Sequence, residues 1–142
     1  MSRARHILEV MDQCGLRITD QRKTLAAIFE ETHQPLTPKK IYGRMNEIYK
    51  GLSLDTVYRN LRKLVDIGAI EPITFPDGVR YQVKCTHVNH HHHLICLSCE
   101  QTMPIEMCPI ELGIGIPEKF QIVQHTFQIH GYCAICSEDK HE

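Results

Sequence analysis

Four cysteines in two closely spaced pairs have the arrangement of a metal site. Cys96 and Cys99 form one Cys-x-x-Cys pair, and Cys133 and Cys136 form another. Each such turn places two thiolates on one side of a loop, and two turns supply the tetrahedral four-sulfur shell that structural zinc prefers. The sequence therefore predicts a structural zinc site. A thiol redox module is the alternative, but no thioredoxin-like strand–helix–strand pattern accompanies the pairs.

A run of four histidines leads directly into the first cysteine pair. If the segment from His90 to Cys96 is extended, alternate side chains point to opposite faces, so His91 and His93 share one face and His90 and His92 the other. Neutral imidazole suits divalent zinc, iron, nickel or manganese. A solvated polar run is the alternative, but four adjacent histidines beside a cysteine pair favour metal. Each pair could contribute to a separate metal site.

A further histidine, His125, lies in an alternating stretch near the end of the sequence. We expect a strand there, with Val123, His125, Phe127 and Ile129 on one inward face. On that face His125 is either a hydrogen-bonded core histidine or a metal ligand carried on a rigid strand. The sequence leaves both interpretations open.

Charge and potential ligands divide the chain into two halves. Up to Ile70, 12 Lys and Arg stand against 8 Asp and Glu, a net of +4; from Glu71 on, 4 stand against 9, a net of −5, and the two sum to −1. Six of the seven cysteines and eight of the ten histidines lie in the second half. A basic first half indicates a polyanion as partner. A length of 142 residues fits one domain or two small ones.

The sequence predicts a cytoplasmic protein. Its first ten residues carry scattered charges and no apolar core, so we expect no signal peptide. No apolar run is long enough to cross a membrane. In a reducing compartment cysteines favour metal ligation over disulfides, and an odd number of them argues against full pairing.

Four helices are expected in the basic half, because apolar residues recur there at helical spacing between recognisable caps. The predicted segments are residues 3–14, 19–31, 37–49 and 53–68, with Thr19, Thr37 and Ser53 as N-caps and Gly15 and Gly68 as stops. The last two are joined by a short turn containing Gly51, as in a helix-turn-helix.

The last of these helices has two contrasting faces. The face expected to be buried consists of Leu54, Val57, Leu61, Leu64 and Val65. The other face carries Thr56, Arg59, Asn60 and Lys63, with Tyr58 at the flank. Such polar groups suit phosphates and base edges in the DNA major groove, although a solvated face would look the same.

Two apolar runs, Ile70–Phe75 and Val79–Val83, follow this helix and are joined by Pro76-Asp77-Gly78. This pattern predicts a β-hairpin. Helices, a helix-turn-helix and then a hairpin make a winged helix. The combination favours binding to double-stranded DNA.

Four stretches together resemble the ferric uptake regulator family of bacterial metal-sensing repressors. They are GLRITDQR (15–22), TVYRNL (56–61), HHHHLICLSC (90–99) and HTFQIHGYCAIC (125–136). The resemblance implies an α+β chain with a winged helix-turn-helix DNA-binding domain over residues 1–83, a hinge over 84–90, and a small α/β metal-binding dimerisation domain over 91–142. It also implies a homodimer that closes onto a palindromic DNA operator when metal binds.

The resemblance assigns roles to individual residues by motif. Tyr58 and Arg59 match the pair on the recognition helix that contacts DNA, and Thr56 opens the same motif. Arg17 and Arg22 match basic positions that meet the DNA backbone or minor groove. The sensing site inside the dimerisation domain is matched by His90, His92, Glu111 and His125.

A second regulatory site is implied at the hinge. Cys85, His91, His93 and Glu71 form a plausible tetrahedral set of one sulfur, two nitrogens and one oxygen. Thiolate is softer than carboxylate and favours zinc over ferrous iron or manganese, so the set is similar to the zinc uptake regulator branch. His33 matches a hinge ligand of the iron branch and is expected here to be a surface residue.

The chain departs from the family pattern between Glu111 and His125. The long amphipathic helix of the family is expected to be very short or absent, because the stretch is short and holds two Gly and a Pro. Cys108 is also extra. It is either a core thiol, the commoner role of a buried cysteine, or a substitute ligand.

The resemblance thus implies a repressor that controls zinc uptake and homeostasis genes, with Zn²⁺ in both the structural and the regulatory sites. An iron, peroxide or nickel sensor that uses Fe²⁺, Mn²⁺ or Ni²⁺ is the alternative in the same family. A zinc enzyme is the alternative of another class. We expect neither catalysis nor a small organic substrate, because the sequence has no His-Glu-x-x-His motif and no glutamate placed as a general base.

Overall fold

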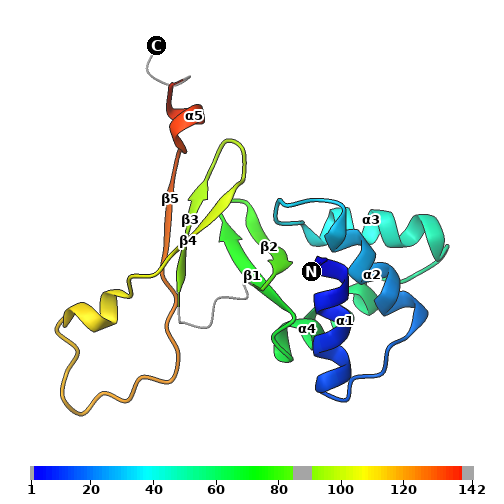
Figure 1. The fold of residues 1–142 in the computed structure, drawn as a ribbon, viewed down its shortest axis with the longest axis horizontal. Coiled ribbons are helices and arrows are strands. Elements are labelled where there is room, and N and C mark those ends of the chain that lie inside the picture. The colour runs from blue at the N-terminus through cyan, green and yellow to red at the C-terminus, as the bar shows by residue number, and fades with distance from the viewer. Residues whose placement is uncertain (1, 85–90, 139–142) are drawn as a thin grey trace. The chain divides into compact units, whose positions relative to one another are not determined.

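The chain forms two compact units, residues 1–85 and 86–142. The structure, a computed structural model, describes residues 2–84 and 91–138 (Figure 1). The boundary between the units falls within the segment predicted as the hinge. In the part of the chain that is described, no helix is both long enough and apolar enough to span a bilayer.

Unit 1 begins with the four predicted helices. They are α1 (Arg3–Gln13), α2 (Asp20–Glu30), α3 (Pro38–Ile48) and α4 (Leu54–Asp66). The predicted N-caps are confirmed, because the hydroxyls of Thr19, Thr37 and Ser53 each accept a hydrogen bond from the backbone N–H three residues on. Gly68 follows α4 with a φ of +78°, a conformation that glycine adopts without strain.

The core of unit 1 lies where the apolar stripes of the four helices meet. Its fully buried members include Ile7 of α1, Leu25 of α2, Ile41 of α3 and Leu61 of α4. Ile70, the first residue of the following strand, joins the same cluster. This shared core fixes α4 against the other helices and leaves one of its faces in water.

The predicted wing is confirmed as an antiparallel hairpin of β1 (Ile70–Phe75) and β2 (Gly78–Val83). Leu36, just before α3, pairs with Tyr81 of β2 through two backbone hydrogen bonds of 2.8 Å. The hairpin is therefore bonded to the segment that begins the helix-turn-helix.

One predicted core position in α4 is wrong. Leu54 is 47% exposed, whereas Val57, Leu61 and Leu64 are buried and Val65 is partly buried. Leu54 is the first residue of the helix, and helical periodicity alone does not show that the packed stripe begins one turn later.

Unit 2 is built on a small mixed sheet with the strand order β4-β3-β5. β3 (His92–Cys96) lies in the middle, antiparallel to β4 (Thr102–Ile105) and parallel to β5 (Gln128–Gly131). A single 3₁₀ turn, η1 (Pro109–Leu112), and a short helix, α5 (Ala134–Glu138), complete it.

The segment between η1 and β5 has no helix or strand, and Figure 1 shows it as an extended trace. The expected near-absence of the long helix is confirmed. The expected long last strand is wrong, since Val123 is 97% exposed and only Gln128–Gly131 pair with β3. The pairing covers β3 from His93 to Cys96, which leaves no described strand for residues 122–127 to pair with.

Candidate metal centres and DNA-binding surface

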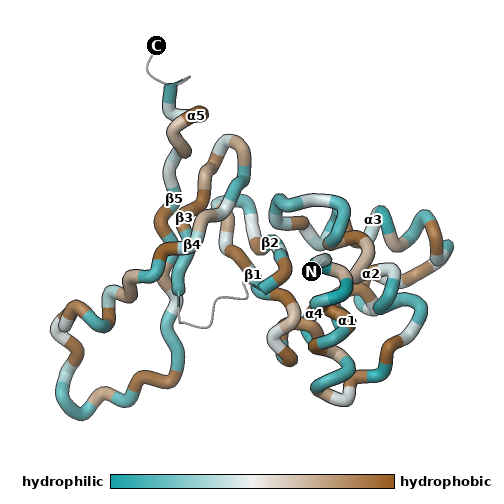
Figure 2. Tube along the Cα trace, in the orientation of Figure 1, coloured by the Kyte–Doolittle hydropathy of each residue, from teal (hydrophilic) through white to brown (hydrophobic). Residues whose placement is uncertain are grey.

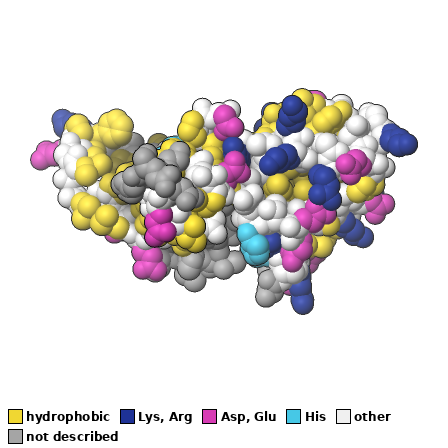
Figure 3. Space-filling view, turned by 90° about the horizontal axis from the view of Figure 1, so that it is seen from above, with side chains coloured by type: hydrophobic (Ala, Val, Ile, Leu, Met, Phe, Trp, Pro, Cys, Tyr) yellow, Lys and Arg dark blue, Asp and Glu magenta, His cyan; other side chains and the backbone are white. Residues whose placement is uncertain are grey.

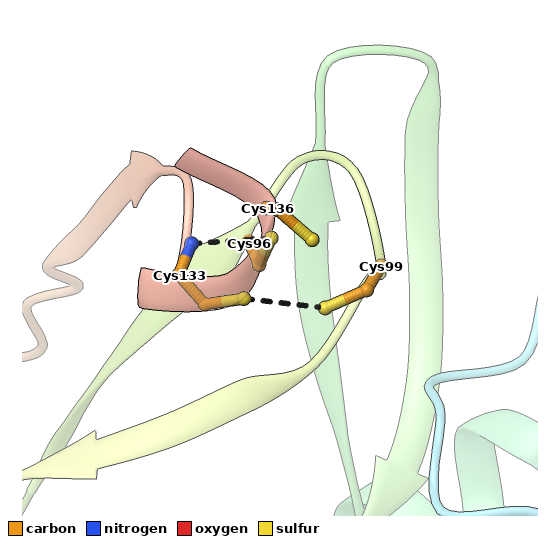
Figure 4. A group of neighbouring side chains, drawn as sticks. All are labelled: Cys96, Cys99, Cys133 and Cys136. Atoms are coloured by element: carbon orange, nitrogen blue, oxygen red, sulfur yellow. Dashed lines mark hydrogen bonds between the residues drawn. The ribbon is translucent and has the colours of Figure 1, made fainter. Parts of the chain in front are cut away.

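The two cysteine pairs meet at one end of the sheet in unit 2. Cys96 ends β3 and Cys99 lies in the turn after it, while Cys133 and Cys136 lie just before and within α5. Figure 4 shows the four side chains pointing toward one another, and their Sγ atoms all lie within 4.8 Å of each other. The parallel pairing of β3 and β5 causes this, because parallel neighbours reach the same edge of a sheet.

Hydrogen bonds prepare this cluster for a cation. The backbone N–H of Cys133 donates to Cys96 Sγ at 3.4 Å and, with the N–H of Cys99, lowers the pKa of the Cys96 thiol to about 6. Hydrogen bonding with the Cys133 side chain raises the pKa of Cys136 to about 12. The Sγ atoms of Cys99 and Cys133 are 3.9 Å apart. Four thiols this close resist sharing several negative charges unless a cation balances them, so the arrangement fits a tetrahedral thiolate metal site.

The histidines at and just before the start of β3 alternate as the sequence predicts. The rings of His91 and His93 lie together, with centroids 5.0 Å apart. The His92 ring contacts His125 at 5.1 Å and Phe127 at 5.6 Å. His92 and His93 are both more than nine-tenths buried. The two faces of β3 therefore present separate imidazole groups.

Cys108 joins His92 and His125 in a second candidate metal site. One ligand atom from each of the three lies within 4.8 Å of the others, and Cys108 Sγ is 3.2 Å from His125 Nε2. Of the residues expected here, Glu111 lies in η1 with an exposed side chain, outside this group, and His90 lies outside the described residues. The structure thus brings together two of the four expected residues and adds a thiol.

The residues expected at the hinge site are distributed over both units. Glu71 lies in β1 of unit 1, where its Oε1 accepts a hydrogen bond from Gln82 Nε2 at 2.8 Å. His91 and His93 belong to unit 2, and Cys85 lies outside the described residues. The hinge site remains a prediction. His33 is exposed, as expected, and its Nδ1 is 2.7 Å from Arg3 Nη1.

Helix α4 presents the expected polar face. Tyr58 is 37% exposed, and Arg59 is exposed and forms an ion pair with Asp55 at 2.9 Å. Thr56 is half-buried, and its hydroxyl lies 2.7 Å from that of Ser53 at the helix N-cap. Figure 3 shows Lys and Arg side chains spread over unit 1. Tyr58 and Arg59 are accessible to a partner, whereas Thr56 is mainly part of the cap.

The two arginines expected to contact DNA outside α4 differ in their environment. Arg17 is exposed. Arg22 is half-buried, and its guanidinium donates to the Arg17 carbonyl at 2.6 Å and to Asn60 Oδ1 at 3.1 Å. Asn60 in turn donates to the Thr56 carbonyl. Arg22 therefore also connects α2 to α4, a structural role that its sequence position alone does not reveal.

A helix-turn-helix followed by a hairpin wing, joined to a cysteine- and histidine-rich α/β unit, defines a winged-helix regulator with a metal-binding domain. Residues 13–132 match the model of the ferric uptake regulator family, and the chain belongs to this family. It is a metal-responsive transcriptional regulator, and members of the family are not enzymes.

Relatives and solved structures agree with this assignment. The chain is 36% identical to a ferric uptake regulation protein of Staphylococcus epidermidis over 133 residues, covering 93% of this chain and 95% of the relative. The solved structure of a zinc-bound manganese uptake regulator is 28% identical in sequence to this chain and superposes with a TM-score of 0.59. The match covers 90% of this chain and 98% of that regulator's chain. The structure of a zinc uptake regulator complexed with zinc and DNA superposes with a TM-score of 0.77 over 96% of this chain and 94% of its own chain. At 19% sequence identity this match shows that the two chains share a fold.

Replacing Arg59 with alanine is expected to weaken DNA binding by about 1–3 kcal/mol if the guanidinium contacts bases or phosphates. The control is Arg5→Ala, because Arg5 is also an exposed arginine in a helical ion pair, with Glu9 at 3.1 Å, but lies on α1. Fluorescence anisotropy with an operator duplex at fixed salt measures both variants. Equal losses in the two would show that only net charge matters.

Proposed function

We propose that the chain is a zinc-responsive repressor that binds a palindromic operator as a homodimer and controls zinc uptake and homeostasis genes. The observation that carries the choice of metal is the donor set near the hinge. Cys85 supplies a thiol close in sequence to the paired rings of His91 and His93, whose centroids are 5.0 Å apart. Sulfur and imidazole ligands together favour zinc over hard ions such as manganese.

In this proposal the four-cysteine site holds zinc permanently and stabilises unit 2. The regulatory ion binds Cys85, His91 and His93 together with Glu71. Its ligands come from the wing, the hinge segment and unit 2, so a bound ion favours one arrangement of the two units. Two recognition helices in a dimer must be spaced by about one turn of DNA, roughly 34–36 Å. Metal therefore raises DNA affinity by selecting that arrangement, and DNA raises metal affinity equally.

Homodimer formation is supported by the exposed apolar surface of unit 2. Leu112, Ile114, Phe120 and Val123 are each more than half exposed. Monomeric soluble proteins rarely expose large contiguous apolar patches. A second copy of the chain would remove these side chains from water.

An iron-responsive regulator is the second candidate. The curated relatives at 35–36% identity are named ferric uptake regulation proteins. Their similarity extends over more than nine-tenths of the chain. Iron is therefore the competing metal that an experiment must exclude.

The deciding measurement is operator binding as a function of buffered free metal. Protein that keeps only its four-cysteine metal is titrated with zinc, ferrous iron, manganese and nickel in separate series. We expect zinc to activate binding at the lowest free concentration. Activation by ferrous iron but not by zinc would overturn the proposed metal and retain the regulator.

Truncating Cys85 to alanine is expected to abolish zinc-dependent operator binding without unfolding either unit. The reason is that the regulatory ion loses its only proposed sulfur ligand, while the four cysteines of the structural site are unchanged. Anisotropy with and without zinc gives the result, and circular dichroism checks folding. Cys14→Ala, which removes an exposed thiol at the end of α1, is the matched control. An operator affinity that responds to zinc as before would remove Cys85 from the site.

A further inference from the structure

The thiol of Cys108 lies in an environment suited to a metal ligand. The residue is 3% exposed, and its Sγ is 3.2 Å from His125 Nε2. The buried ring of His92 completes the group, with one ligand atom from each residue within 4.8 Å of the others. The three side chains come from different segments: β3, the residue before η1, and the stretch before β5. A simple core thiol would not require two imidazoles to converge on it.

Cys108 and His125 also bracket the least regular part of unit 2. They are 17 positions apart, and between them only η1 has defined secondary structure. Backbone hydrogen bonds in this segment are local, such as Phe120 N–H to the Pro117 carbonyl at 3.0 Å. Figure 2 shows hydrophobic stretches along it. A groove of about 270 Å³ is lined by Ile114, Phe120, His125 and Phe127, among others. Within the described part of the chain, the backbone hydrogen bonds of this segment therefore do little to fix its shape.

We propose that Cys108 takes the place of Glu111 in the divalent-metal site that the family resemblance implies at His92 and His125, and that the ion bound by this thiolate and the two imidazoles fixes the segment 109–124 against β3. A set of one sulfur and two nitrogens suits zinc, and cobalt binds similar donors. Metal binding displaces the thiol proton, and three protein ligands leave one tetrahedral position for another group. This site deepens the proposed function, because it names a second metal-dependent element beside the apolar surface assigned to the partner copy.

The site is tested with cobalt, whose bond to a thiolate produces a charge-transfer absorption band. The starting protein is the full chain with zinc in the four-cysteine site and Cys85 replaced by serine. Of its cysteines, only Cys108 and the exposed Cys14 then remain to bind added cobalt. We expect a charge-transfer band on adding cobalt. Adding Cys108→Ser should remove the band and weaken cobalt binding by more than about 100-fold, above the 10–100-fold effect of losing an outer partner of a ligand. Adding Cys14→Ser should change neither.

A second measurement follows the segment itself. Hydrogen–deuterium exchange of residues 109–124 should slow when zinc is added to the Cys85→Ser protein, and should not slow in the Cys85→Ser/Cys108→Ser protein. Cys108→Asp serves as a second variant, because its carboxylate can still bind metal: it should keep the protection and lose the cobalt band. A band that persists without Cys108, or no band in the Cys85→Ser protein, would overturn the site.

Neither measurement uses DNA. Failure of the Cys108 site therefore leaves the zinc-responsive operator binding to be judged by its own titration. Conversely, operator binding that is activated by iron alone would overturn the proposed function. The cobalt band would still test whether Cys108 binds metal.

Discussion

Replacing Cys133 with serine is expected to unfold unit 2 and to abolish metal binding by the four cysteines. The thiol of Cys133 lies 3.9 Å from that of Cys99, and its backbone N–H bonds Cys96 Sγ, so the residue contacts both sulfurs of the other pair. Small domains built around structural zinc are unfolded without the metal. Unit 2 has few fully buried apolar side chains of its own among its described residues, chiefly Ile95, Cys96 and Cys108. We therefore expect a metal in the four-cysteine site to supply much of the stability of unit 2.

Metal analysis and hydrogen exchange over residues 91–138 would measure this effect. Cys14→Ser is the matched control, since Cys14 is exposed and lies in unit 1. The control should keep its metal and its exchange pattern. A Cys133→Ser protein that retains one tightly bound zinc per chain and normal protection would contradict a structural role for this cluster.

Replacing Leu61 with alanine is expected to destabilise unit 1 by about 2–5 kcal/mol, the cost of removing a buried leucine and leaving a cavity. Leu61 is fully buried in α4 and belongs to the core shared by the four helices. Such a loss is a large fraction of a domain's total stability. Operator binding should fall with it, because the packing of the buried face of α4 is the main interaction that holds its exposed face in place.

Leu54→Ala is the control for this prediction, because it makes the same chemical change in the same helix at a side chain that is 47% exposed. Its effect should stay within about 0.5 kcal/mol. Urea denaturation followed by far-ultraviolet circular dichroism reports mainly on unit 1, which contains the four long helices. If both variants lost the same stability, the core assignment within α4 would be wrong.

Much of this architecture could be predicted from the sequence, because local signals and spacing agree. Hydroxyl residues at Thr19, Thr37 and Ser53 cap the helices, and a Pro-Asp-Gly turn closes the wing. The Cys-x-x-Cys spacing indicated the cysteine cluster without any knowledge of the sheet. In each case a short stretch of chain carries the information.

The rest depended on contacts between distant segments. Periodicity placed Leu54 in the core, but only the packing of other elements decides where a buried stripe begins. Alternation from Val123 to Ile129 suggested a longer strand, but the described pairing with β3 covers only Gln128–Gly131. Cys108, and not Glu111, lies beside His92 and His125 because of the path that the backbone takes before η1. The spacing of Glu111 from Cys96 in the sequence does not predict that path.

The parallel alignment of β3 and β5 has a consequence for how the chain finds its native pairing. Cys96 lies opposite Gly131, two positions before Cys133, and this alignment alone brings the cysteine pairs together. A slip by one residue would turn every side chain of β5 to the opposite face of the sheet. Misaligned chains would offer an incomplete sulfur cage and bind the ion weakly. We therefore expect an ion bound by the four cysteines to stabilise the native alignment of β3 and β5 relative to alignments shifted by one residue.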